Sequence, residues 1–263
     1  MKTNFHTHTA RCGHAVGRDE EYVQSAIRGG YQVLGFADHG PWKFSSNYRS
    51  HMRMNPQEEF QDYLRSIRAL REKYRGQIDI RIGLEYEYFP PYMDWMRQIV
   101  RRERLDYLLL GNHFEYSEER RFYFGRQVVD EETLARYVDS ALQGMATGLY
   151  AYLAHPDLFL RGYPSFDRHC EKASIRLCRA AKEQGFPLEY NLCGALEDRR
   201  TGQQHYPHPL FWQIAAAEGC DVIIGVDAHS PDALEDDSLR QEGIRLLTGY
   251  GAHVIDQIPY FAW

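Results

Sequence analysis

The segment Asn4-Phe5-His6-Thr7-His8 combines a short strand-like start with two histidines that are one residue apart. Because side chains alternate between the two faces of a strand, His6 and His8 are expected to point the same way from its end. Two imidazoles on one side supply half of the ligands that a tetrahedral metal ion requires. The segment therefore predicts a strand that ends in part of a metal site.

The same arrangement recurs along the chain, where apolar runs lead into side chains that are able to bind a metal. These runs are 33–37 before Asp38 and His39, 80–84 before Glu85, 107–111 before His113, 150–154 before His155, and 221–226 before Asp227 and His229. Helical patterns lie between them, at 19–27, 55–75, 94–104, 130–145, 167–184, 209–218 and 231–247. Regular alternation of this kind predicts parallel strands joined by crossover helices.

A closed barrel explains the polar strand ends better than an open sheet does. The crevice of an open, doubly wound sheet collects residues from only a few strands near its switch point. A ring brings the carboxyl ends of all its strands together. We therefore predict an α/β barrel formed by residues 1–263 as a single domain, because no repeat, low-complexity tract or linker divides the chain. Long loops are expected at 40–54, 114–129 and 195–208.

Composition narrows the function classes. A formal charge of -6 argues against nucleic-acid binding through a basic surface, but it allows a phosphorylated substrate if bound cations reverse the local charge. The five cysteines lack paired spacing, which favours a reducing compartment over a disulfide framework. The chain shows no signal-peptide pattern and no apolar run of membrane-spanning length. We expect a cytoplasmic protein with no membrane partner, and the oligomeric state stays open.

The strand-end set is too large for one tetrahedral ion. Because carboxylates such as Glu85 and Asp227 are able to bridge ions, the set predicts two or three clustered ions. Imidazole and oxygen ligands without thiolate favour Zn²⁺, Mn²⁺ or Fe²⁺ over Ca²⁺. The candidate ligands are His6, His8, His39, Glu85, His113, His155, Asp227 and His229, with His14 of the first loop as a ninth.

Three neighbours of these candidates have other interpretations. Cys12 is interpreted as a packing residue, since a thiolate would break the ligand pattern. Asp38 is expected to orient a neighbouring ligand. Glu87 shares the strand face of Glu85 but is the weaker candidate, because Glu85 comes first after the apolar run.

These residues resemble the nine-ligand signature of the polymerase and histidinol phosphatase (PHP) superfamily, from the first strand to the last. The chain length and the segments beginning at Asn191 and Gly225 look most like the stand-alone histidinol-phosphatase branch. Asn112 departs from the small or β-branched residue of many members, so the adjoining substrate wall is expected to differ. The matching motifs are His6-Thr7-His8, His14, Ala37-Asp38-His39, Gly83-Leu84-Glu85, Gly111-Asn112-His113, Ala154-His155-Pro156-Asp157 and Asp227-Ala228-His229-Ser230.

The resemblance implies a distorted (β/α)₇ barrel, similar to a TIM barrel, with a trinuclear metal centre at the carboxyl ends of its strands. It implies three divalent ions, with Zn, Mn and Fe as the candidate metals. The implied groups are His6, His8, Glu85 and Asp227 for the first ion; Glu85, His113 and His155 for the second; and His14, His39 and His229 for the third.

A cluster of divalent ions lowers the pKa of a bridging water and supplies hydroxide near neutral pH. No Gly-x-Ser-x-Gly elbow or catalytic cysteine motif competes with this chemistry. We therefore expect a metal-dependent phosphatase that acts on a small phosphorylated substrate. The resemblance points to L-histidinol phosphate, hydrolysed to L-histidinol and phosphate. The alternatives are a phosphoesterase for another monoester, a nucleotide or a diester, and a non-catalytic metal-binding or polymerase-associated module.

Arginines are expected to complete the phosphate site, because a guanidinium fork matches phosphate oxygens. Arg161 follows His155 in the next loop, and Arg199 or Arg200 follows the strand that ends at Asn191. For each arginine the competing interpretation is a solvated surface side chain. Asp227 or His229 is the candidate for proton transfer to the leaving group.

Overall fold

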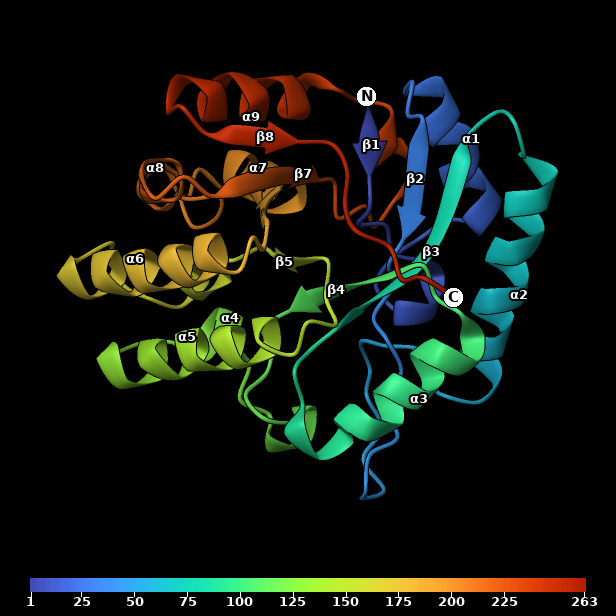
Figure 1. The fold of residues 1–263 in the computed structure, drawn as a ribbon, viewed down its shortest axis with the longest axis horizontal. Coiled ribbons are helices and arrows are strands. Elements are labelled where there is room, and N and C mark those ends of the chain that lie inside the picture. The colour runs from blue at the N-terminus through green and yellow to red at the C-terminus, as the bar shows by residue number, and fades with distance from the viewer.

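The computed structural model describes residues 1–263, and its strands form one sheet in chain order. Each strand pairs in parallel with the next one along the chain. Figure 1 shows the strands in the middle of the molecule, with the helices around them. The strands are β1 (Thr3–Asn4), β2 (Val33–Phe36), β3 (Asp79–Tyr86), β4 (Tyr107–Gly111), β5 (Tyr152–Ala154), β6 (Leu188–Asn191), β7 (Asp221–Gly225) and β8 (His253–Ile255).

Helices connect successive strands, and short 3-10 turns precede or follow several of them. None of these helices combines the length and the apolar character that crossing a bilayer requires. The α-helices are α1 (Asp19–Arg28), α2 (Glu58–Lys73), α3 (Met93–Glu103), α4 (Phe124–Gln127), α5 (Glu131–Met145), α6 (Arg168–Glu183), α7 (Leu192–Thr201), α8 (Pro209–Ala217) and α9 (Ser238–Gly249).

Helix α5 illustrates how local sequence produces these elements. The Asp130 side chain accepts a hydrogen bond from the backbone N–H of Thr133, and Thr133 reciprocates, which satisfies two free donors at the helix start. Leu134, Tyr137 and Ala141 are buried at intervals of three and four residues. That spacing forms one apolar stripe, which packs against the sheet beside β4 and β5.

Seven strands close the ring at its carboxyl rim. The extensions of β1 and β7 pair there, because the N–H of His8 donates to the Ala228 carbonyl at 2.9 Å and the N–H of Ala228 donates to the His6 carbonyl at 3.2 Å. At the opposite end, β8 extends the sheet beyond β7, and the Thr3 hydroxyl donates to the carbonyl of Asp256. The predicted distorted barrel is confirmed, with β8 as an additional strand beside the seven that close the ring.

The barrel interior below the rim is filled by apolar side chains. The Tyr107 hydroxyl crosses the interior and donates to the Phe5 carbonyl at 2.7 Å. A Cβ added at Gly35 would lie 2.2 Å from that hydroxyl, and one added at Gly83 would lie 2.6 Å from the Tyr107 ring. Ile258 of the C-terminal segment joins the same inner cluster. Metal ions and substrate therefore approach the barrel from its carboxyl rim.

The long helices predicted from periodicity are confirmed, but two of the predicted loops contain helices. Residues 195–208 include the second half of α7, and residues 114–129 include α4. The periodicity of α7 is weak, because Leu192 and Gly194 are its only buried residues. Its start is set locally instead, since the Asn191 side chain accepts a hydrogen bond from the N–H of Gly194 at 2.8 Å.

Candidate metal centre

The nine predicted ligand side chains lie together at the carboxyl rim. They reach it from the ends of different strands, so only the closed ring makes them neighbours. Their potential ligand atoms form overlapping groups whose members lie within 4.8 Å of one another. The groups include His6, His8 and Asp227; His8, His39 and Glu85; Glu85, His113 and His155; and His14, His39 and His229.

Four side chains surround one point at the base of this cluster. His6 Nε2 and His8 Nε2 lie 3.1 Å apart, and Asp227 Oδ1 lies 3.4 and 3.0 Å from them. Glu85 Oε2 lies 3.5 Å from His6 Nε2 and 3.7 Å from His8 Nε2. Ligands at zinc distances of 2.0–2.1 Å in a tetrahedron are about 3.4 Å apart. The four atoms have the spacing of a tetrahedral ion site.

The other oxygen of Glu85 belongs to a second group. Glu85 Oε1 lies 3.2 Å from His113 Nε2 and 3.0 Å from His155 Nε2. The two imidazole nitrogens lie 3.2 Å apart. These separations again match the edges of a ligand tetrahedron. One carboxylate therefore faces two potential ions, one with each oxygen.

His14, His39 and His229 form a third and more open group. His39 is buried, with Nδ1 3.1 Å from Glu85 Oε2. The side chain of His229 is 26% exposed, and His14 is exposed. The rings of His14 and His229 are stacked, with centroids 4.8 Å apart. This group lies on the solvent side of the first two.

Several buried polar atoms of the cluster have no hydrogen-bond partner. They are Glu85 Oε2, Asp227 Oδ1, His39 Nδ1 and His155 Nδ1. A buried polar atom without a partner costs about 1–3 kcal/mol, and a charged one costs more. Cations between Glu85, Asp227 and the imidazoles would satisfy these carboxylate oxygens. The donor set of this rim therefore fits bound divalent metals.

Electrostatics favour the ligand forms of both acids. Burial by itself would raise the pKa of Glu85, but the charges of His113 and His6 hold it well below its ordinary value. For Asp227, burial is likewise outweighed, mainly by His6, and its pKa is also held well below its ordinary value. Both acids are therefore ionised, as metal ligands must be.

The imidazoles divide into two classes. Burial lowers the pKa of His39 to about 3 and the pKa of His229 to about 4, so both are neutral and ready to bind a cation. Burial also opposes charge on His113, but the carboxylate of Glu85 raises its pKa to about 10. His113 therefore carries a proton in the metal-free protein, and a metal ion would displace it.

Buried carboxylates fix the outer nitrogens of three imidazoles. Glu189 Oε1 lies 2.8 Å from His6 Nδ1, Asp38 Oδ1 lies 3.3 Å from His8 Nδ1, and Glu87 Oε1 lies 3.1 Å from His113 Nδ1. Such contacts set the tautomer and the ring orientation of histidine ligands. The expected orienting role of Asp38 agrees with this geometry, and Glu87 lies behind His113 instead of competing with Glu85.

Glu189 was not predicted from the sequence to belong to the site. It lies within β6, two residues before the strand end, and not in the loop after it. Besides His6, it accepts hydrogen bonds from the backbone N–H of His155 at 3.1 Å and from the amide of Asn191 at 2.9 Å. An acidic residue inside a predicted strand was the available signal, because a buried charge requires a partner.

Two of the ligand candidates have a strained backbone. His155 has φ of 32° and Asp227 has φ of 52°, in the left-handed region that non-glycine residues rarely adopt. The Glu189 carboxylate holds the N–H of His155, and the Asn191 amide donates to Asp227 Oδ2 at 3.1 Å. Such strain is retained where surrounding contacts over-determine the conformation.

The three arginines have different surroundings. Arg161 is exposed, with its guanidinium 5.9 Å from the ring of Tyr206, and the ring of Tyr206 lies 6.4 Å from that of His155. Arg199 forms an exposed ion pair with Glu242, and Arg200 pairs with Glu197 one helical turn earlier. Of the three, Arg161 is the one that reaches toward the ligand cluster, through the ring of Tyr206, whereas Arg199 and Arg200 are engaged in ion pairs elsewhere.

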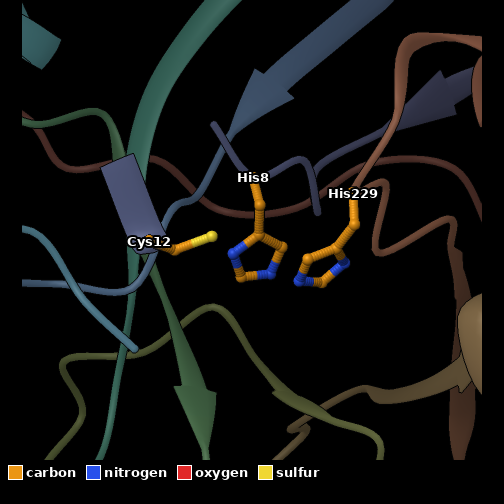
Figure 2. A group of neighbouring side chains, drawn as sticks. All are labelled: His8, Cys12 and His229. Carbon is orange, nitrogen blue, oxygen red and sulfur yellow. The ribbon is translucent and has the colours of Figure 1, made fainter. Parts of the chain in front are cut away.

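Cys12 packs beside the ligands as well as within the core. It is buried, and its sulfur forms a group with ring nitrogens of His8 and His229. Figure 2 shows the sulfur directed toward one side of the His8 ring, with His229 on the other side. The interpretation of Cys12 as a packing residue agrees with its burial but missed this contact.

Asn112 does not line the cluster. Its amide donates to the Tyr137 carbonyl at 2.9 Å, and it accepts from the Ser140 hydroxyl at 2.8 Å. Both partners belong to α5, on the outer side of the sheet. The expectation that Asn112 changes a substrate wall is therefore wrong, because its side chain anchors a helix.

The chain is similar to known proteins over most of its length. The model of the PHP domain family matches residues 4–192. A probable histidinol-phosphatase of Deinococcus radiodurans is 28% identical over 236 residues, which cover 86% of this chain and 85% of the relative. A probable histidinol-phosphatase of Schizosaccharomyces pombe is 30% identical over 252 residues, which cover 88% and 81%.

A solved structure has the same fold. It is the crystal structure of histidinol phosphate phosphatase from Lactococcus lactis, complexed with zinc, L-histidinol and phosphate. The two folds superpose with a TM-score of 0.73 over 99% of each chain, at 19% sequence identity.

Proposed function

The chain belongs to the PHP domain family and is a phosphatase, and we propose that it hydrolyses L-histidinol phosphate to L-histidinol and phosphate. The names of the relatives and the complex formed by the Lactococcus lactis enzyme support this substrate. The observation that carries the proposal is the position of Glu85, with one oxygen in each of two tetrahedral ligand groups. We assign the reaction to one domain, residues 1–263.

The cofactor in this proposal is a cluster of three divalent ions, with Zn, Mn and Fe as the candidates. Glu85 would bridge the first two sites, and its two oxygens have the spacing this requires. Ions bound there supply hydroxide near neutral pH and neutralise charge on phosphate oxygens. The ligands are His6, His8 and Asp227 with Glu85 for the first ion, His113 and His155 with Glu85 for the second, and His14, His39 and His229 for the third.

The side chains of the rim would act on the substrate directly. Arg161 is the candidate for binding phosphate oxygens, since a guanidinium offers two parallel donors. Arg161 lies next to the ring of Tyr206, and that ring in turn faces the ring of His155. Asp227 or His229 is the candidate for passing a proton to the leaving alkoxide; because Asp227 is ionised and His229 is neutral, either residue would first take that proton from the attacking water. His229 is the more accessible of the two, with a side chain 26% exposed against 10% for Asp227. Arg199 and Arg200 remain secondary candidates for phosphate contact.

The substrate is tested by phosphate release from a panel that contains L-histidinol phosphate, mononucleotides, a small aryl phosphate and a diester. We expect the highest kcat/KM for L-histidinol phosphate and complete loss of turnover after chelation. Preference for a nucleotide or a diester would show that the proposed substrate is wrong but would leave the assignment as a phosphoesterase in place. No turnover of any member by metal-loaded protein would favour a non-catalytic metal-binding module.

A further inference from the structure

One buried arginine lies close to the cluster but belongs to none of the ligand groups. Arg53 lies in the segment between β2 and α2, and its side chain is 1% exposed. A buried guanidinium keeps its charge and requires partners for all of its N–H groups. The partners of Arg53 are two acidic residues and the carbonyl of Gly40.

The first acidic partner connects Arg53 to a ligand candidate. Two nitrogens of Arg53 donate to the two oxygens of Glu87, at 3.1 and 2.7 Å. Glu87 Oε1 also lies 3.1 Å from His113 Nδ1. The indole N–H of Trp42 donates to Glu87 Oε2 at 3.0 Å, so both oxygens of this carboxylate are fixed. The orientation of the His113 ring therefore depends on the contact between Glu87 and Arg53.

The second acidic partner connects Arg53 to another rim segment. Arg53 Nε donates to Glu118 Oε2 at 2.6 Å, and Glu118 is itself 2% exposed. Its other oxygen accepts from the hydroxyls of Tyr48 and Ser50. Segments 40–54 and 113–129 thus meet around one guanidinium, which also holds the carboxylate behind His113.

We propose that Arg53 is a positioning residue for the second metal site, acting on His113 through Glu87; this rests on the proposed function only in taking His113 as a ligand. Glu87 contacts His113 with one oxygen, and that oxygen also faces Arg53 Nη2. Without Arg53, the carboxylates of Glu87 and Glu118 would be buried without their cation and would repel each other. Glu87 would then leave the position that aligns Nε2 of His113 with Glu85.

The planar fork of arginine is essential to this role. Three of its nitrogens each donate to a carboxylate oxygen, and two of those bonds form a parallel pair on Glu87. A lysine keeps the charge but offers a single ammonium point, so it is unable to hold Glu87 and Glu118 in the same geometry. Arg53→Lys therefore separates positioning from net charge.

The test measures metal and does not depend on turnover. Zinc-loaded wild type, Arg53→Lys and Glu118→Gln are compared for zinc per chain and for the rate of zinc transfer to a chromophoric chelator. The absorption spectrum of the cobalt-loaded proteins reports the geometry of the site. Arg71→Lys is the matched control, because Arg71 pairs with Asp106 and the carbonyl of Ile80, far along the strands from the rim.

We expect Arg53→Lys to release one zinc about 10- to 100-fold faster than wild type, with an altered cobalt spectrum. Glu118→Gln is expected to act in the same direction by a smaller factor, and Arg71→Lys to behave as wild type. Wild-type zinc release from folded Arg53→Lys would overturn the proposal. If Arg53→Lys does not fold, Glu118→Gln decides, and unchanged zinc release from that variant would overturn it. A wild-type chain that holds zinc but does not hydrolyse L-histidinol phosphate refutes the substrate and leaves this proposal standing.

Discussion

The two ligand groups that share Glu85 differ from the outer group in burial and in what holds their rings. His6 and His113 each have a buried carboxylate behind Nδ1. In the outer group, the nearest partners of Nδ1 in His14 and His229 are backbone carbonyls, at 3.0 and 2.9 Å, and Asp227 Oδ1 lies farther from His229 Nδ1, at 3.5 Å. A carboxylate raises ligand basicity and fixes the ring more firmly than a backbone carbonyl does. The inner groups are preorganised, and the outer group is adaptable.

This difference has a consequence for metal binding. The inner groups already have the spacing of ligand tetrahedra, so an ion requires little movement there. The outer rings are stacked and have to turn before they can share an ion. We expect the inner ions to bind more tightly than the outer ion.

The largest effect is expected from Glu85→Gln, which removes the charge shared by both inner groups. We expect kcat/KM to fall by at least about 10³-fold, or roughly 4 kcal/mol of transition-state stabilisation, with loss of bound metal. Circular dichroism is expected to show an intact fold. Glu72→Gln, the same change at an exposed position of α2, is the control. Near-normal turnover and metal content in Glu85→Gln would show that the bridge does not exist.

Glu189→Gln tests the residue that supports His6 without changing any of the ligand residues themselves. The amide keeps the size of the side chain but removes the negative charge beside His6 Nδ1. We expect zinc affinity to weaken about 10- to 100-fold, measured by competition with a chelator. Glu183→Gln, at the exposed end of α6, controls for charge alone. Equal affinities in the two variants would remove Glu189 from the site.

His14→Ala tests the outer group directly. Because His14 contributes only there, we expect elemental analysis to show the loss of one ion while the inner ions stay bound. His6→Ala is the matched comparison, and we expect it to lose an inner ion. Should both variants lose the same ions, the three groups would be one cooperative unit, and the inner and outer groups would not bind metal independently.

Arg161→Ala separates substrate binding from metal binding. Loss of one charge-assisted contact to phosphate is worth about 1.5 kcal/mol, so we expect KM to rise about tenfold. Metal content is expected to stay at the wild-type value, since Arg161 contacts Tyr123 and Tyr206 and no ligand candidate. An unchanged KM would show that Arg161 is a surface residue without a role in substrate binding, and would leave Arg199 and Arg200 as the candidates for phosphate contact.

The smallest effect is the pH dependence of the metal-free fold. The pKa of His113 is about 10 in the folded chain, above its ordinary value of 6.5. Its protonated form therefore contributes stability that is complete below pH 6.5 and is lost as the pH rises through 10. We expect the thermal midpoint of metal-free protein to fall by a few degrees between pH 7 and 9.5. In metal-loaded protein this dependence is expected to vanish, and a parallel fall in both forms would contradict the assignment.

Much of the fold could be predicted from the sequence, because the patterns that indicate its strands and helices are local. The runs before Glu85, His113 and His155 are apolar and short, and they became β3, β4 and β5. Glu87 could be separated from Glu85 only by a slight preference, because residues two apart share a strand face. The structure shows that the strand ends between them, so Glu87 lies behind His113 and pairs with Arg53.

Other features lacked a local signal. Arg199 and Arg200 were grouped with Arg161 because all three follow strand ends. Helix α7 carries Arg199 and Arg200 into exposed ion pairs, and its weak periodicity concealed it. Arg53 was one arginine in a long loop, and its burial depends on two acids distant in the chain.

The sequence by itself determined which residue types stand at the strand ends, and hence the alternation, the barrel and the candidate ligands. Those are properties of one strand at a time, set by side-chain period and hydrophobicity. Only the tertiary structure decided which oxygen of Glu85 faces which imidazoles, and that Glu189 and Arg53 support them. Such contacts join residues far apart in the chain, such as Arg53 and Glu118, 65 positions apart, and His6 and Glu189, 183 positions apart, so no local pattern records them. Ring closure creates them, because it brings every strand end to one rim.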